Sequence, residues 1–382
     1  MIRSVDRSEG HRRRRREQVR RRRLALAVAA ALAFLGGLAM GAGGDEQPPP
    51  RQAVEATPTP APPPPVEELP LEQQVGRMVI LRFAGTSPPG YVREALREGR
   101  AAGAILFADN VADPAQLRRL TRSLRRASPH ALICVDQEGG PIRILPWAQP
   151  ERAAPAQQAW GEVREDSRAA ARDLRAAGVN VTLAPVADVP TVEGAAMANR
   201  AFTTDPDAAA AAVAESVAGW QEGGVATTLK HFPGLGGATV NTDEGTAVIE
   251  RTREQLDDDL KPFVAGIHMG SEFVMVGHAT YPALDEDNIA SQSPAVVDGL
   301  LRDQLGFDGV AMTDSLEAAA VQAVNDVEEA AVTSARAGID VILTTGRGSY
   351  SRVYDALLDE ARSNDAFAER VRASAARVLA AQ

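Results

Sequence analysis

The fold class that the sequence predicts is α/β, as a single (β/α)8 barrel over residues 67–382, and three observations predict it. Eight short apolar or β-branched runs recur along this part of the chain. Stretches rich in Ala, Arg and Glu, with helical spacing, separate most of these runs. Apolar runs that alternate with helices are typical of a parallel sheet, and eight such units suit a closed barrel. An open doubly wound sheet is the alternative, but no nucleotide-binding glycine fingerprint follows the first run.

The expected elements follow the chain in order. The strands are expected within residues 76–85, 102–107, 131–137, 179–188, 225–232, 272–279, 308–315 and 339–346. The clearest helical stretches are 113–127, 162–177, 206–223 and 324–337. The one cysteine, Cys134, lies inside the third apolar run, which predicts a buried thiol. A single cysteine also excludes an intramolecular disulfide and a multi-cysteine metal site.

The N-terminal part of the sequence predicts a membrane-targeting segment and a linker. Residues 1–23 hold 11 Arg and 3 acidic residues, and Leu24–Gly44 follows with 21 uncharged residues. That length suits a transmembrane helix, and the charge before it places the N-terminus in the cytoplasm. A cleaved signal peptide is the alternative, because Ala39-Met40-Gly41 resembles a cleavage site. Residues 45–66 form a Pro-rich, extended linker to the folded domain.

This arrangement predicts where the folded part works and which partners it lacks. Either version of the N-terminal segment puts residues 67–382 outside the cytoplasm, anchored to the cell membrane or secreted. Beyond residue 23 the chain holds 30 basic and 48 acidic residues, so we expect no binding of nucleic acid or anionic surfaces through net charge. The sequence contains no metal-binding or organic-cofactor motif, so we expect no cofactor. We expect the chain to act as a monomer.

Polar residues stand at the C-terminal ends of the expected strands. In a barrel this is the face where active sites form. Each one alone is compatible with a strand-end cap or a hydrogen-bonded core residue, but six in register predict a cleft. A cleft of carboxylates and cations suits a polyhydroxyl ligand such as a sugar, and a buried Asp there can act as a nucleophile. The six residues are Asp136, Asp188, Lys230, His231, His278 and Asp314.

Several motifs resemble those of one enzyme family, in the same order along nearly all of residues 67–382. They include "GAILFADNV", "VDQEGGPIRIL", "NRAFTTDP", "LKHFPGLG", "VMVGHATYPALD" and "GVAMTDSLEA". The chain resembles glycoside hydrolase family 3, in its single-domain β-N-acetylhexosaminidase branch. The resemblance implies retaining hydrolysis of β-glycosides, with N-acetylglucosamine-containing cell-wall saccharides as the expected substrates. A β-glucosidase or β-xylosidase specificity is the alternative with the same mechanism.

The resemblance also implies roles for individual residues. Asp314, in "MTDSL", matches the family's nucleophile, which forms a covalent glycosyl-enzyme. His278, in "GHA", is expected to line the site rather than to react. The remaining matches are residues that bind the substrate: Asp136, Arg143, Arg200, Lys230 and His231.

The loop "LKHFPGLGGATVNTDEG" (Leu229–Gly245) departs from the family pattern. The branch normally has a His after "KHFPG", and then an Asp-Ser-His whose Asp and His form the proton-transfer dyad. Leu235 stands in place of the first His, and Asn241 and Asp243 stand in place of the dyad. No histidine occurs between His231 and His268, so a shifted alignment does not restore the dyad.

Three readings of this departure remain open. In the first, Asp243 or the adjacent Glu244 replaces the histidine as acid/base, since most retaining glycosidases use a carboxyl there. A carboxyl beside the ionised Asp314 has a raised pKa, as a general acid needs. In the second, the enzyme reacts slowly because it protonates the leaving group poorly; in the third, the domain only binds saccharides. We expect a mobile loop that approaches the substrate, given freedom by its glycines, with Asn241 and Glu244 as further candidates to line the site.

Overall fold

The structure is a computed structural model that describes residues 63–382. The predicted basic segment, the helix Leu24–Gly44 and nearly all of the Pro-rich linker lie outside these residues. Between residues 63 and 382, no helix combines the length and the apolarity that crossing a bilayer requires.

Eight parallel strands form a sheet that curls back on itself. They are β1 (Val79–Arg82), β2 (Gly103–Ile105), β3 (Leu132–Val135), β6 (Val181–Thr182), β7 (Thr228–Phe232), β8 (Phe273–Val276), β11 (Val310–Thr313) and β12 (Ile342–Leu343). Hydrogen bonds give the neighbour orders β12-β1-β2-β3-β6 and β11-β8-β7. Parallel bridges, Val181 to Ala226 and Met312 to Val341, join the two groups at both edges. Each predicted apolar run therefore contains one strand, and the predicted α/β fold with a parallel sheet is confirmed.

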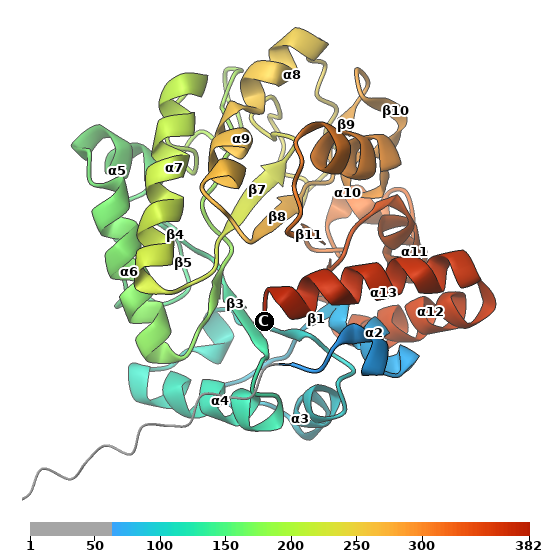
Figure 1. The fold of residues 1–382 in the computed structure, drawn as a ribbon. Coiled ribbons are helices and arrows are strands. Elements are labelled where there is room, and N and C mark those ends of the chain that lie inside the picture. The colour runs from blue at the N-terminus through green and yellow to red at the C-terminus, as the bar shows by residue number, and fades with distance from the viewer. Residues whose placement is uncertain (1–62) are drawn as a thin grey trace, which may run out of the picture. The chain divides into compact units, whose positions relative to one another are not determined.

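Helices cover the outside of the strands (Figure 1). The main helices are α3 (Gly90–Arg97), α4 (Pro114–Ala127), α6 (Val163–Ala177), α7 (Pro206–Gly223), α8 (Arg253–Asp259), α9 (Lys261–His268), η4 (Ala295–Gln304), α11 (Val327–Ala337), α12 (Ser349–Ser363) and α13 (Asp365–Ala380). The shorter pieces are η1 (Val66–Glu68), α2 (Leu71–Arg77), η2 (Ala108–Asn110), α5 (Ala154–Trp160), η3 (Ala290–Gln292) and α10 (Ala319–Gln322). Two antiparallel ribbons, β4 (Gln137–Gly139) with β5 (Ile142–Arg143) and β9 (Thr280–Tyr281) with β10 (Asp285–Ile289), extend from the loops.

Local signals explain where the helices begin and end. The Asp205 carboxylate accepts the Ala208 N–H at 2.8 Å and caps α7, whose first residue is Pro206. The same helix ends at Gly224, whose φ of 76° belongs to the left-handed region that favours glycine. Asp113 caps α4 in the same way, and Pro114 follows it. The four longest predicted helical stretches lie on α4, α6, α7 and α11.

Side chains fill the inside of the curled sheet. Alternate strand residues, among them Ile80, Cys134 and Met312, pack together there, while their neighbours pack against the outer helices. Cys134 is fully buried as predicted, and burial raises the pKa of its thiol. With a filled interior, space for a ligand is left at the ends of the strands.

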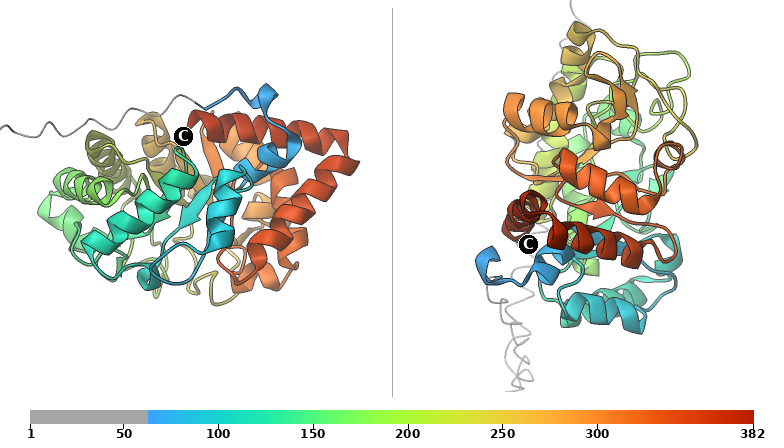
Figure 2. Two further views of the ribbon diagram at one scale, coloured as in Figure 1. Left: turned by 90° about the horizontal axis from the view of Figure 1, so that it is seen from below. Right: turned by 90° about the vertical axis from the view of Figure 1, so that its right-hand side faces the viewer.

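The two ends of the described chain pack side by side. The red C-terminal helices lie beside the blue first helix in both views of Figure 2. Val66 and Leu69 pack with Ala375 and Leu379 of α13, and the Tyr354 hydroxyl donates to the Glu72 carbonyl at 3.0 Å. The last helix therefore closes the domain against its own beginning.

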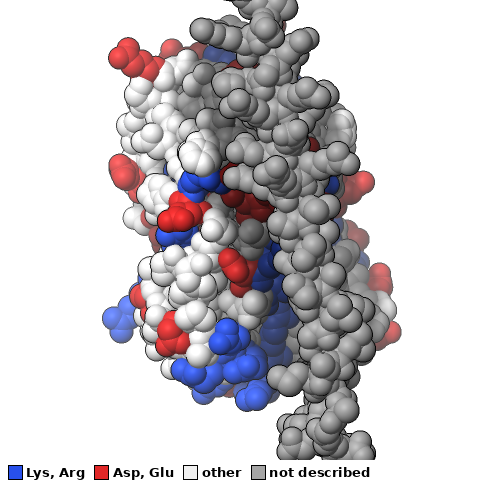
Figure 3. Space-filling model, turned by 90° about the vertical axis from the view of Figure 1, so that its left-hand side faces the viewer, with Lys and Arg blue, Asp and Glu red and all other residues white. Residues whose placement is uncertain are grey.

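Basic side chains gather on α4, although the domain as a whole is acidic. At 3.6 residues per turn, the five arginines of this helix fall within about 120° of its surface. Leu117, Leu120 and Leu124 occupy the opposite, buried side. Figure 3 shows basic side chains concentrated at the lower end of this face, where α4 lies. The arginines are Arg118, Arg119, Arg122, Arg125 and Arg126.

Candidate active site

A cavity of about 350 Å³ opens at the C-terminal ends of the strands. This volume lies within the range of small-ligand sites. Carboxylates, cations and apolar side chains all contribute to its wall. The lining residues are Ile105, Phe107, Asp136, Ile142, Leu183, Arg200, Lys230, His231, Asn241, Asp243, Met275, Asp314, Ser315, Leu343 and Thr345.

Asp314 follows β11 and is held by both its backbone and its carboxylate. Its N–H donates to the Val276 carbonyl at 3.1 Å, and the Ser315 N–H donates to Asp314 Oδ1 at 2.7 Å. The other oxygen, Oδ2, lies 3.8 Å from His231 Nε2. Burial alone would raise the pKa of Asp314, but His231 and the Ser315 N–H hold it below its ordinary value. The carboxylate is therefore ionised and fixed in place, as a nucleophile must be.

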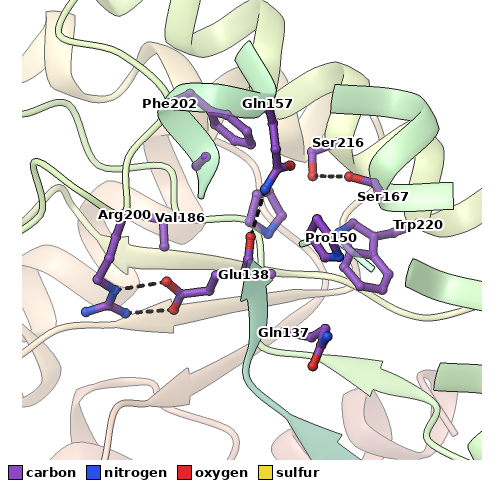
Figure 4. Close-up of a pocket in the computed structure, with 13 residues that line it drawn as sticks. Gln137, Glu138, Pro150, Gln157, Ser167, Val186, Arg200, Phe202, Ser216 and Trp220 are labelled. Atoms are coloured by element: carbon purple, nitrogen blue, oxygen red, sulfur yellow. Dashed lines mark hydrogen bonds and ion pairs between the residues drawn. The ribbon is translucent and has the colours of Figure 1, made fainter. Parts of the chain in front are cut away.

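Two cations of the site share a buried carboxylate, Glu138. Lys230 Nζ lies 2.6 Å from Glu138 Oε1 and 2.6 Å from Asp136 Oδ1. The Arg200 guanidinium donates to both oxygens of Glu138, at 2.8 and 2.9 Å, as Figure 4 shows. Although burial opposes its charge, Lys230 and Arg200 lower the pKa of Glu138 to about 2. The same carboxylates raise the pKa of Lys230 against the effect of burial, so both cations stay charged in the cavity wall.

A second, much smaller cavity of about 10 Å³ lies behind Glu138. It is about the size of one water molecule. Figure 4 shows Gln157 reaching the backbone of Glu138, where its side-chain amide donates to the Glu138 carbonyl at 3.0 Å. Ser167 and Ser216 hydrogen-bond to each other at 3.0 Å on the far wall. Gln157 therefore holds the backbone of Glu138 in place, and the cavity itself is too small for a sugar.

His231, at the end of β7, is oriented by Asp188. Its Nδ1 lies 2.7 Å from Asp188 Oδ2, and its backbone N–H donates to Asp188 Oδ1 at 3.1 Å. The register of β7 shifts between Leu229 and Phe232, and the Lys230–His231 peptide bond is cis. Lys230 and His231, both predicted substrate-binding residues, line the cavity.

His278 supports the nucleophile from behind the cavity wall. Its Nε2 lies 3.0 Å from the Ser315 carbonyl oxygen, which can only accept, so Nε2 carries the proton. Its Nδ1 lies 2.8 Å from the Ser291 hydroxyl, which donates to it. Burial lowers the pKa of His278, consistent with a neutral ring. His278 therefore fixes the turn after Asp314 rather than lining the site.

The loop after β7 is packed along its first half, contrary to the predicted mobility. Gly234, Leu235 and Gly236 are buried. The Thr191 N–H donates to the Gly236 carbonyl at 3.1 Å, and a Cβ on Gly236 would lie 1.8 Å from the Val189 carbonyl oxygen. Gly236 therefore serves a close backbone approach, and its φ lies outside the left-handed region.

The second half of the loop brings Asp243 to the cavity. The Ala319 and Ala320 N–H groups donate to the carbonyls of Asp243 and Thr242, at 3.3 and 3.1 Å. The residue as a whole is exposed at the rim, but its position against the cavity and the charge of Asp314 raise the pKa of its carboxyl. Asn241 Nδ2 lies 3.4 Å from Asp243 Oδ2. The loop thus presents a carboxyl with a raised pKa to the cavity that Asp314, with a lowered pKa, also lines.

The structure does not bring every predicted residue into the cavity. Arg143 lies on β5, where its neighbour Ile142 faces the cavity instead, and Arg143 is not among the described residues of the wall. Glu244 is exposed and, within residues 63–382, also lies outside the set that lines the cavity. Sequence reasoning missed Glu138, although it stands inside the quoted "DQEGG" motif, and missed the role of Asp188. In residues 63–382, no cluster of three or more His, Cys, Asp or Glu suits a metal ion.

Comparisons with known proteins agree with this geometry. Residues 70–381 match the family described as "Glycosyl hydrolase family 3 N terminal domain". A protein of Stenotrophomonas maltophilia (strain R551-3) named beta-hexosaminidase is 36% identical over 278 residues, which cover 70% of this chain and 82% of that protein. One of the same name from Xylella fastidiosa (strain 9a5c) is 36% identical over 280 residues, with the same coverage of 70% and 82%.

Two solved structures resemble the fold closely. The family 3 beta-N-acetylglucosaminidase of Paenibacillus sp. str. FPU-7 matches with a TM-score of 0.79 and 34% identity, over 82% of this chain and 62% of that one. This chain therefore spans less than two thirds of that protein. The beta-N-acetylhexosaminidase of Beutenbergia cavernae DSM 12333 matches with a TM-score of 0.76 and 32% identity, over 82% of this chain and 98% of that one.

Proposed function

The chain belongs to glycoside hydrolase family 3, and we propose that it is a retaining β-N-acetylhexosaminidase that acts on N-acetylglucosamine-containing cell-wall saccharides. The observation that carries this proposal is that two carboxyls and two cations line the same cavity. Asp314 has a lowered pKa and Asp243 a raised one, and the cations are Lys230 and Arg200. Relatives named beta-hexosaminidase support the choice of sugar. A closed (β/α)8 barrel carries the site.

In the first step of the proposed reaction, an Asp314 oxygen attacks the anomeric carbon. The bond between that carbon and the leaving-group oxygen breaks, and the oxygen takes the proton of Asp243. In the second step, Asp243 accepts a proton from a water whose oxygen attacks the same carbon, and the Asp314 ester bond breaks. Two inversions retain the β configuration. The environments of the two carboxyls shift their pKa values in opposite directions, up for Asp243 and down for Asp314, which is the division of roles that this chemistry requires.

The charged residues of the wall are proposed to bind the hydroxyls of the reacting sugar. Lys230 and Arg200 are donors, and Asp136 offers carboxylate oxygens that Lys230 does not fully occupy. Apolar side chains complete the wall and suit the C–H faces of a sugar ring. They are Ile105, Phe107, Ile142, Leu183, Met275 and Leu343.

We also propose an extracytoplasmic location, on the basis of the sequence of residues 1–66 alone. The predicted helix Leu24–Gly44 either anchors the protein to the cell membrane or is removed during secretion. Fractionating cells that express the full chain tests this proposal. Recovery of the intact protein from the cytoplasm would contradict both versions.

The function is tested with aryl N-acetyl-β-glucosaminide and aryl β-glucoside substrates and an activated fluoro-glycoside that traps the intermediate. The wild-type chain should hydrolyse the N-acetylglucosaminide faster and gain the mass of one glycosyl group. Asp314→Asn should do neither. The matched control is Asp308→Asn, which changes an exposed aspartate just before the same strand, β11. If the chain binds saccharides but neither hydrolyses nor forms an adduct with any sugar tried, the proposed hydrolase function is wrong and the chain is a saccharide-binding protein.

A further inference from the structure

Asp188 is a fully buried carboxylate that joins two parts of the site without facing the cavity itself. Its side chain is 0% exposed, and it is missing from the described residues that line the cavity. Oδ2 lies 2.7 Å from His231 Nδ1, and Oδ1 accepts the N–H groups of His231 at 3.1 Å and Leu235 at 2.7 Å. Burying a charged group costs free energy unless hydrogen bonds compensate it, and these three bonds supply that compensation.

We propose that Asp188 is a positioning residue for the hydrolysis, which rests on the proposed function. It fixes the tautomer and direction of His231 beside the nucleophile. It also fixes the start of the loop that carries Asp243. One carboxylate thereby sets the geometry on both sides of the anomeric carbon.

The link to His231 follows from the chemistry of the imidazole ring. A carboxylate can only accept, so Nδ1 of His231 carries a proton and Nε2 is directed at the cavity. Nε2 then lies 3.8 Å from Asp314 Oδ2, and from there His231 lowers the pKa of the nucleophile.

The link to the loop passes through the backbone of Leu235. Leu235 is buried, and the residues after it are tied to the segment that follows Asp188: Thr191 N–H donates to the Gly236 carbonyl at 3.1 Å and Ala196 N–H to the Ala238 carbonyl at 2.8 Å. Asp188 adds a side-chain bond to these two backbone bonds, because its carboxylate accepts the Leu235 N–H. From there the chain runs five residues to Asp243, whose own backbone is tied to Ala319.

Other charged groups act on the pair and enter its pH dependence. Asp188 acts on Arg200, Asp259 and Tyr281 as well as on His231. His231 in turn acts on the two carboxyls Asp314 and Asp243. Replacing Asp188 therefore changes the environment of Asp314 through His231, and the acid limb of the pH profile reports this change.

The test uses Asp188→Asn, His231→Gln and the double variant in the full chain. Asparagine keeps the shape and an oxygen for the two backbone N–H groups, but its amide faces Nδ1 with a donor instead of an acceptor. We expect kcat/KM for an aryl N-acetylglucosaminide to fall ~10- to 100-fold, the effect of losing a charged hydrogen bond. We also expect the acid limb to move to higher pH. In the His231→Gln background the same substitution should have little further effect.

Asp259→Asn is the matched control, because it removes a neighbouring buried carboxylate that pairs with Arg251. It should leave the acid limb in place. The proposal is wrong if Asp188→Asn keeps the wild-type pH profile, or if its loss is equally large without His231.

A second readout does not need activity. In ¹⁵N-histidine-labelled protein, the His231 signal, assigned with His231→Gln, should show a protonated Nδ1 that Asp188→Asn abolishes. An unprotonated Nδ1 in the wild type would overturn the proposal. If the wild type hydrolyses no glycoside, the proposed function fails, while this measurement still decides whether Asp188 keeps the proton on His231 Nδ1.

Discussion

Replacing Asp243 by Asn tests the assignment of the acid/base most directly. The structure places this residue at the cavity rim on a loop tied to Ala319 and Ala320, and Asn keeps that backbone. The variant keeps the shape of the side chain but loses the transferable proton and the carboxylate that acts as base in the second step. Loss of general acid–base help costs ~10²–10⁴-fold in rate. We expect this full loss for substrates whose leaving groups are poor, because these need the proton most.

The assay measures kcat/KM for aryl N-acetylglucosaminides with leaving groups of increasing acidity. The variant should approach the wild type at the dinitrophenyl end of the series and fall away at the methylphenyl end. Added azide should restore turnover of activated substrates, because it attacks the glycosyl-enzyme without a general base. Glu244→Gln is the matched control, since this adjacent acid is exposed and stands apart from the described cavity wall.

The pH profile gives a second signature of the same prediction. Desolvation of its carboxyl against the cavity and the charge of Asp314 raise the pKa of Asp243. Its acid form therefore persists to higher pH than that of an ordinary aspartate and is lost as the pH rises through the raised pKa. The alkaline limb of the wild-type kcat/KM profile should therefore be missing in Asp243→Asn. An equal loss for every leaving group, with the alkaline limb intact, would refute the assignment.

Three further predictions concern the surroundings of the site. Glu138→Gln should destabilise the fold by about 3 kcal/mol at pH 7, the free-energy equivalent of lowering its pKa from 4.5 to about 2. Because a lowered carboxyl pKa contributes stability above pH 4.5 that is lost as the pH falls towards 2, the difference in unfolding free energy should shrink in acid; a constant difference would contradict this. Gly236→Ala should displace the loop and cost ~1–3 kcal/mol and most activity, because its Cβ would lie 1.8 Å from the Val189 oxygen. Gly237→Ala, whose nearest contact would be Ile249 at 3.0 Å, is its control, and equal effects in thermal melts and kinetics would contradict the packing argument. His231→Gln should move the acid limb of the kcat/KM profile to higher pH, because His231 lowers the pKa of Asp314. An acid limb at the wild-type pH would show that other groups keep the nucleophile ionised.

Many residues of the candidate site can be predicted from the sequence, because the ends of the strands can be predicted. The apolar runs indicate where the strands lie. The first polar residue after a run then stands at the C-terminal end of a strand, where Asp136 and Asp314 line the cavity. Arg143 shows the limit of this rule. On a strand, neighbouring side chains point to opposite faces. In the register of β5, Ile142 lines the cavity, and Arg143 therefore points to the other face.

The remaining parts depend on contacts between distant segments. Arg200 meets Glu138 across 62 residues, and His231 meets Asp188 across 43. No local pattern specifies such pairs, so the sequence identifies the residue types without their partners. The glycines of the loop illustrate the same point, since the sequence reads them as flexibility and the structure uses Gly236 for tight packing.

The loop is held at Asp243 by its main chain, through carbonyls that accept from Ala319 and Ala320. Such bonds are indifferent to which side chain the position carries. The backbone bonds therefore place no demand on the side chain at position 243, so a substitution there can keep the course of the loop. If Asp243 is the proton donor, as proposed, then an engineered enzyme could carry a donor of different pKa at this position, with its optimum pH moved and the rest of the cavity wall unchanged.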